Sequence, residues 1–145
     1  MTAHIVHKKI SLKASPAEVW DALTDPEKTK KYFFNCRVFS SWKPGSPIVF
    51  KGRIFLVKKI EMHGTIIQAE PGKLLQYKLA NGKDGKTFSF VTDKLNYSNG
   101  GTVLEITDDV GAGEGAEKRK ARSEKGWDKV LAGLKKLVEG AEKKE

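Results

Sequence analysis

Acid–base chemistry in this chain would fall first to its three histidines and the carboxylates near them. His63 lies two residues after Glu61, and a histidine paired with a carboxylate is a common general acid or base. In a β-strand, residues two apart share a face, and the apolar Met62 and Ile66 fall on the other face. We therefore expect Glu61 and His63 to face solvent.

The other candidates do not indicate a metal site or a nucleophile. His4 and His7 have no nearby set of carboxylate or cysteine ligands. Cys36 is the only cysteine, which excludes an internal disulfide and any site built from several thiolates. There is no Gly-x-Ser-x-Gly, His-Glu-x-x-His or Walker motif. The sequence predicts no catalytic residue, no metal site and no cofactor.

Two features could suit phosphate groups, and both have a simpler interpretation. Gly111, Gly113 and Gly115 precede a predicted helix, but their spacing misses the dinucleotide motif and no strand follows. A turn is the simpler interpretation. Residues 118–122 concentrate part of the net charge of +9, yet few exposed aromatic residues accompany them. The pattern favours a solvated basic face over nucleic-acid binding.

The length and the N-terminal segment bound the class of protein. The chain has 145 residues, 39% of them apolar, which is typical of one domain with a real core. Lys8 and Lys9 follow directly on the first seven residues, so no apolar run is long enough for a signal peptide or membrane insertion. We expect a single domain over residues 1–145 and a cytoplasmic location.

The first forty residues predict a strand followed by two abutting helices. Apolar and polar residues alternate, imperfectly, over about residues 3–14. Ser15 to Glu18 form a capping box with Pro16 at the first helical position. Asp25 and Pro26 repeat this start signal, so a second short helix should carry Tyr32, Phe33 and Phe34 near its end.

Residues 37–109 predict an antiparallel meander of about six strands. Short apolar runs alternate there with turn sequences that contain Pro-Gly or Asn-Gly, and no helical pattern intervenes to make parallel crossovers. A helix should then cover residues 117–142, because large apolar residues recur every three or four positions. These are Trp127, Val130, Leu131, Leu134, Leu137 and Val138. Their stripe must lie against the sheet.

A sheet packed on a bulky helix can leave a cleft, so the sequence predicts an apolar pocket with Trp127 in its wall. The phase of the strand at residues 87–95 stays open, because Phe88 and Phe90 favour one face whereas Val91 and Leu95 favour the other. The expected ligand-binding residues are Tyr32, Phe33, Trp42, Phe50, Ile60, Met62, Ile66, Phe88, Phe90, Trp127, Leu131 and Leu134. Each of them could equally be ordinary core.

Four motifs together resemble one family. They are residues 14–26, residues 41–45, the Gly-Gly-Thr at 100–102, and the helix pattern from Gly126-Trp127 to Glu139-Gly140. The chain resembles the activator of 90-kDa heat-shock-protein (Hsp) ATPase homologue family, in the START-like or SRPBCC superfamily. The eukaryotic activators resemble it only in their C-terminal domain. The resemblance implies a helix-grip fold, which agrees with the element order expected from the residues.

The expected fold class is therefore α+β, with a curved antiparallel sheet wrapped around a long C-terminal helix. The resemblance implies binding of a lipid-like or aromatic molecule between sheet and helix, by a carrier or sensor. Two alternatives remain: a chaperone-associated interaction domain that contacts an acidic partner, and a cyclase- or aromatase-type enzyme. The fold does not choose among them.

Overall fold

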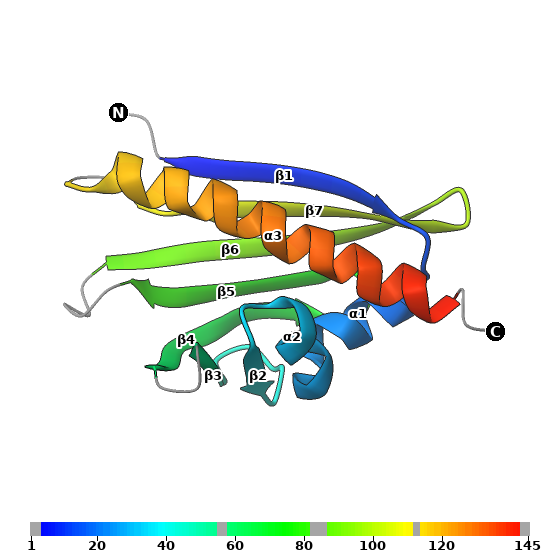
Figure 1. Cartoon of the computed structure of the whole chain (residues 1–145), viewed down its shortest axis with the longest axis horizontal. Helices are drawn as coiled ribbons and strands as arrows, with labels where there is room; N and C mark the ends of the chain where they lie inside the picture. The colour runs from blue at the N-terminus through cyan, green and yellow to red at the C-terminus, as the bar shows by residue number, and fades with distance from the viewer. Residues whose placement is uncertain (1–3, 55–57, 82–86, 112–113, 143–145) are drawn as a thin grey trace.

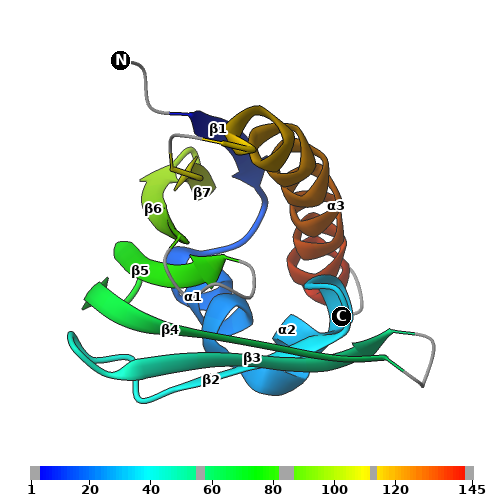
Figure 2. The same cartoon turned by 90° about the vertical axis from the view of Figure 1, so that its left-hand side faces the viewer.

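An antiparallel sheet of seven strands curves around one long helix (Figures 1 and 2). The computed structural model describes residues 4–54, 58–81, 87–111 and 114–142. The strands are β1 (Ile5–Leu12), β2 (Cys36–Ser40), β3 (Pro47–Ile54), β4 (Lys58–Glu70), β5 (Leu74–Asn81), β6 (Thr87–Ser98) and β7 (Gly101–Asp109). The helices are α1 (Pro16–Thr24), α2 (Pro26–Tyr32) and α3 (Ala116–Glu142).

The strand order is β1-β7-β6-β5-β4-β3-β2, and every neighbouring pair is antiparallel. Apart from β1, which joins the edge beside β7, each strand pairs with the next in the chain. Between β1 and β2 the chain passes through α1 and α2, which cover one end of the sheet (Figure 1). The predicted helix-grip architecture is confirmed, including six strands after the two short helices.

Local capping explains where the short helices begin. The Ser15 side chain accepts a hydrogen bond from the backbone of Glu18, and the Glu18 carboxylate accepts one from the backbone of Ser15. Asp25 caps α2 in a similar way through Glu27 N. These contacts satisfy amide donors that a helix leaves free at its start. The Tyr32 hydroxyl then donates to Ala22 O at 2.8 Å and ties α2 to α1.

The hairpin turn between β6 and β7 has the conformation that its sequence predicts. Asn99 and Gly100 have φ values of 48° and 80°. Left-handed dihedrals at both central residues define a turn whose twist matches that of the flanking strands, and Asn-Gly adopts it easily. The turn predicted at residues 81–85 lies outside the described residues except for Asn81.

Helix α3 packs very closely on α2 at one point. A Cβ atom added to Gly133 would lie 2.8 Å from Tyr32 Cβ, closer than real side chains approach. Here the absence of a side chain lets two helices touch. The C-terminal half of α3 is correspondingly well buried, with Leu134 0% and Val138 5% exposed. In the part of the chain that the structure describes, no helix is both long and apolar enough to cross a membrane.

Candidate functional site

An open cavity of about 660 Å³, here called the outer cavity, lies between the N-terminal half of α3 and the sheet. Its apolar wall comes from β4, β5 and β6, from the residue that follows β7, from α3 and from the segment that follows α2. The apolar side chains in this wall are Phe33, Phe34, Met62, Leu79, Val91, Val110, Trp127 and Val130. Figure 2 views the molecule from the end at which this half of the helix lies.

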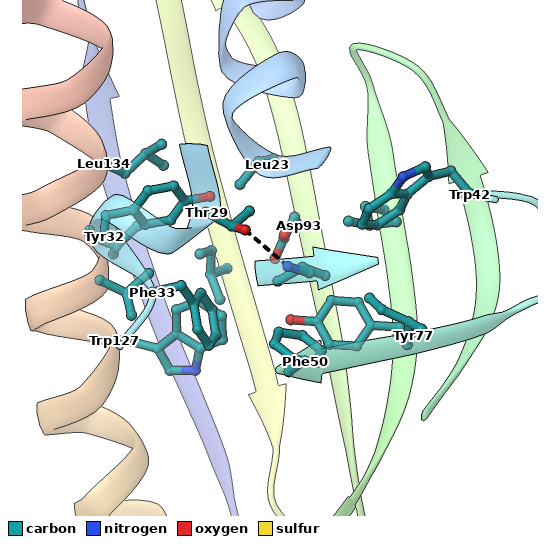
Figure 3. Close-up of a pocket in the computed structure, with 16 residues that line it drawn as sticks. Leu23, Thr29, Tyr32, Phe33, Trp42, Phe50, Tyr77, Asp93, Trp127 and Leu134 are labelled. Carbon is teal, nitrogen blue, oxygen red and sulfur yellow. Dashed lines mark hydrogen bonds between the residues drawn. The ribbon is translucent and has the colours of Figure 1, made fainter. Parts of the chain in front are cut away.

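A second cavity, here called the inner cavity, lies deeper in the fold and has a volume of only about 30 Å³ (Figure 3). That space holds roughly one or two water-sized molecules. Phe33 fills much of the region, with ring centroids 5.3 Å from Phe50 and 5.9 Å from Trp127. Phe33, Trp127 and Val130 line both cavities, so their side chains separate the inner one from the outer one.

Two buried carboxylates lie at these cavities. Asp108 lines the outer cavity and is 6% exposed. Its Oδ2 accepts hydrogen bonds from Trp127 Nε1 at 3.0 Å and from Ser123 Oγ at 2.6 Å. Its Oδ1 is buried and has no hydrogen-bond partner among the described residues. One oxygen of this carboxylate is therefore held by side chains of α3, and the other is an acceptor without a donor among the described residues.

Asp93 lines the inner cavity and is 3% exposed, and its Oδ1 likewise has no partner in the described part of the chain. Burial raises the pKa of the Asp93 carboxyl to about 7, and the negative charge of Asp108 adds to the rise. Because Asp93 pairs with Ile106 and Asp108 lies two residues further along β7, the carboxylates are diagonal neighbours, roughly 7–8 Å apart in the backbone. They form an acid pair.

The pattern of large apolar residues alone does not predict the acid pair. Yet both share the phase of apolar neighbours: Asp93 alternates with Val91 and Leu95, and Asp108 follows Leu104 and Ile106. An acidic residue in the apolar phase of a strand was thus the signal in the sequence.

Most of the expected pocket residues do lie around the cavities, although not in one shared space. Phe33 and Trp127 line both, and Met62 lines the outer cavity. Ile66 is 1% exposed and belongs to the core without lining either cavity. The inner cavity is lined by Tyr32, Trp42, Phe50, Leu131 and Leu134.

The expectation for Phe90 was wrong. Phe90 is 44% exposed, and Val91, Asp93 and Leu95 are the buried residues of β6. Alternation along a strand allows only one of two adjacent residues to face the core, and β6 keeps an unbroken register with both neighbours, so no bulge reconciles the two phases. The side chains of Phe88 and Ile60 lie outside the described part of the structure.

The histidine–carboxylate pairs lie away from the cavities, whereas Cys36 lies in the wall of the outer cavity. His63 Nε2 lies 2.6 Å from Glu61 Oε2 on the exposed face of β4, as expected. His7 makes a similar exposed contact with Glu105. Cys36 is fully buried, and burial raises the pKa of its thiol. Among the residues that the structure describes, no cluster of His, Cys, Asp and Glu could hold a metal ion.

The curved sheet, the gripped helix and the cavity between them define a helix-grip protein of the START-like class. The family model described as Activator of Hsp90 ATPase homolog 1-like protein matches residues 13–139. The chain belongs to this family. A search among curated proteins found no match.

Solved structures support the same assignment. The solution structure of ChR145 from Cytophaga hutchinsonii is 34% identical, covers 97% of this chain and 98% of its own, and has a TM-score of 0.76. Protein MLL2253 from Mesorhizobium loti is 19% identical over 93% of this chain and 96% of its own, with a TM-score of 0.78. The Aha1 dimer from Colwellia psychrerythraea is 20% identical over 95% of this chain and 96% of its own, with a TM-score of 0.73. The last two show the fold alone.

Proposed function

We propose that this protein binds a small hydrophobic molecule in the outer cavity, as a carrier or sensor. The observation that carries the proposal is the cavity itself. Its volume of about 660 Å³ falls within the range of about 300–1,000 Å³ that ligand sites commonly have. Its wall includes Phe33, Met62, Leu79 and Trp127, which would remove apolar surface of a ligand from water.

The two cavities support different roles for the aromatic residues. The inner cavity is too small for an organic ligand, so Phe50 and Tyr77 act there as core. The outer cavity is open to solvent. A ligand would therefore contact Trp127 and Phe33 from outside rather than sit in the middle of the fold.

Naphthalene probes test the proposal, beginning with 2-methylnaphthalene. A probe that binds only the folded protein should raise the free energy of unfolding by about 2.7 kcal/mol at a hundred times its Kd. Binding should also change Trp fluorescence, because Trp127 lines the cavity. Melting temperatures and fluorescence titrations measure both effects. If no naphthalene probe changes either quantity, the proposal fails.

Two matched variants locate the binding. Leu79→Trp places a large side chain in the wall of the outer cavity and should weaken probe binding at least tenfold. Leu74→Trp makes the same change on the same strand, outside both cavities, and should leave binding unchanged. Equal affinities in the two variants would place the probe elsewhere.

The chaperone-associated alternative rests on the family and on one charged surface. Lys118, Arg122 and Lys125 are exposed on α3, within a chain of net charge +9, and could contact an acidic partner. Binding to an Hsp90-type chaperone should then weaken as salt rises. Reversing the charges of Arg122 and Lys125 should abolish it, whereas reversing Lys30 and Lys31 on α2 should not. Binding that ignores these changes would count against this alternative.

The cyclase- or aromatase-type alternative needs polar groups at the cavity, and the acid pair Asp93 and Asp108 meets that need. A carboxyl whose pKa lies near 7 can transfer protons at neutral pH. Conversion of a linear poly-ketone by the wild type but not by Asp93→Asn would support this alternative. Binding of the poly-ketone without any product would contradict it.

A further inference from the structure

The acid pair is the feature of the cavities that apolar binding does not explain. A buried carboxylate is stabilised only when hydrogen bonds or a positive charge replace its lost hydration. Asp108 receives two hydrogen bonds, both at Oδ2, and Asp93 Oδ1 receives none from the described residues. Two acceptor atoms are thus left unmet beside a space that could admit a ligand.

The surroundings of Asp93 make its position more unusual. Figure 3 shows its carboxylate among the side chains that line the inner cavity, with the rings of Tyr32, Phe33 and Tyr77 around it. The acidic groups that face it are Asp108 from β7, Tyr77 from β5 and Tyr32 from α2. Burial raises the pKa values of both tyrosines, so they stay neutral. Among the described residues, no basic group offsets the burial of Asp93.

The route from the outer cavity to the acid pair is short. Asp108 is already in the wall of the outer cavity, and Phe33, Trp127 and Val130 line that space as well as the inner one. The next two residues after Phe33, Phe34 and Asn35, have φ values of 48° and 62°. Phe34 in this left-handed region is strained, which is typical of segments at binding sites.

We propose that the acid pair of Asp93 and Asp108 recognises a hydrogen-bond donor on the ligand, so that the cavity selects apolar molecules carrying a hydroxyl group or a protonated amine. This inference rests on the proposed function, because it assigns the polar end of the same ligand. The apolar body lies against Trp127, Met62 and Leu79, and the donor reaches Asp108 Oδ1 first. A ligand whose only polar group is a carboxylate is repelled there.

The rim of the cavity gives the competing expectation. Arg122, Lys125 and Lys129 are exposed and line the outer cavity, and these cations would favour an anionic group at the entrance. Water screens such exposed charges, whereas the acid pair is buried. The donor preference should therefore exceed the preference for an anion.

Four naphthalene probes of the same shape separate these expectations: 2-methylnaphthalene, 2-naphthalenemethanol, 2-naphthylmethylamine and 2-naphthoate. In the wild type at pH 7, at least one of the two donor probes should bind about tenfold or more tightly than 2-methylnaphthalene. A gain for the alcohol alone identifies a neutral hydroxyl as the donor. A larger gain for the amine identifies a cation.

Variants at the acid pair complete the test. Asp108→Asn and Asp93→Asn should each remove most of the donor preference. Asp109→Asn makes the same charge change in the next residue of β7, which neither cavity includes, and should keep the preference. Melting temperatures show whether each variant folds, and the wild-type probe series stands without any variant.

Three results would overturn the inference in distinguishable ways. Equal binding of all four probes would leave the proposed function standing and remove only the donor preference. Tightest binding of 2-naphthoate, lost when Arg122 and Lys129 become Gln, would assign recognition to the rim. Failure of every probe to bind would remove the proposed function and this inference together.

Discussion

The two halves of helix α3 pack against the rest of the protein in opposite ways. The C-terminal half, here called the closed end, buries Leu134 completely and brings Gly133 against Tyr32. The N-terminal half, the open end, places Trp127 and Ser123 beside a cavity of about 660 Å³. One amphipathic helix thus serves as core at one end and as the wall of a binding site at the other.

This contrast shows how the fold can keep a cavity without losing its stability. Protein interiors are packed to high density, and gaps in that packing reduce stability. Here the closed end, together with α1 and α2, supplies the tight packing. The open end is then free to make fewer apolar contacts and to bury Asp108, whose Oδ1 accepts no hydrogen bond from the described residues.

The largest expected effect is at the closed end. Leu134→Ala should lower the free energy of unfolding by about 2–5 kcal/mol, because it leaves a cavity in tightly packed core. Leu79→Ala at the open end should cost well under half as much, because that side chain is half-buried at a cavity wall. Chemical denaturation measures both. Equal losses would show that the two ends do not differ in packing.

The next effect is a pH dependence at Asp93, which lines the inner cavity. The folded-state pKa of Asp93, about 7, lies above the unfolded value near 3.9, so the folded state binds one more proton between these pH values. Stability should therefore fall as pH rises from about 4 to about 7, by at most about 1.4 kcal/mol per pH unit. Above about pH 7 Asp93 is ionised in both the folded and the unfolded state, so the stabilising contribution of its extra proton is fully lost.

Asp93→Asn should flatten that fall, and the difference between the two unfolding curves isolates the residue. The comparison also cancels the contributions of half-buried carboxyls such as Glu105 and Glu139, whose lowered pKa values act in the opposite direction. Asp108, Tyr77 and Tyr32 are the titratable groups that face Asp93. Parallel curves for wild type and variant would mean that Asp93 does not titrate in this range.

A smaller effect is expected where α3 touches α2. Gly133→Ala puts a methyl group 2.8 Å from Tyr32 Cβ, so the two helices must move apart. Overpacking of this kind typically costs about 1–3 kcal/mol, and the better helix propensity of Ala returns part of it. A net loss of about 1–2 kcal/mol in thermal or chemical unfolding is expected. A stabilised variant would show that the closed end tolerates expansion.

The smallest effect has the opposite sign. In Gly126→Ala at the open end, the new methyl group would meet only the Phe34 ring, at 3.5 Å, which is an ordinary contact. The helix propensity of Ala should then raise stability by about 0.5–1 kcal/mol. The same substitution therefore stabilises one end of α3 and destabilises the other. Losses of similar size at Gly126 and Gly133 would contradict the comparison.

Local signals in the sequence predicted most of the fold. The capping box at Ser15, the Asp25-Pro26 start and the apolar stripe from Trp127 to Val138 located the starts of all three helices within about one residue. These features depend on neighbours in the chain, so they can be identified without tertiary structure. The phase of β6 could not, because Phe90 and Val91 are both apolar and only sheet packing decides which one is buried.

The site was less predictable than the fold for a related reason. Phe33, Met62 and Trp127 were identified because large apolar residues mark any interior, but the sequence did not separate core from cavity wall. That distinction depends on the distance between α3 and the sheet. Two features together set this distance: the close contact of Gly133 with Tyr32, and the bulk of Phe33 and Trp127.

The sequence by itself determined the order of the elements, the helix starts, the turn chemistry and the face of α3 that meets the sheet, because each follows from residues close together in the chain. Only the tertiary structure decided that the interior divides into a filled inner part and an open outer cavity. It also decided that Asp93 and Asp108 meet there. Burial and charge proximity arise between strands, where spacing along the chain carries no direct information.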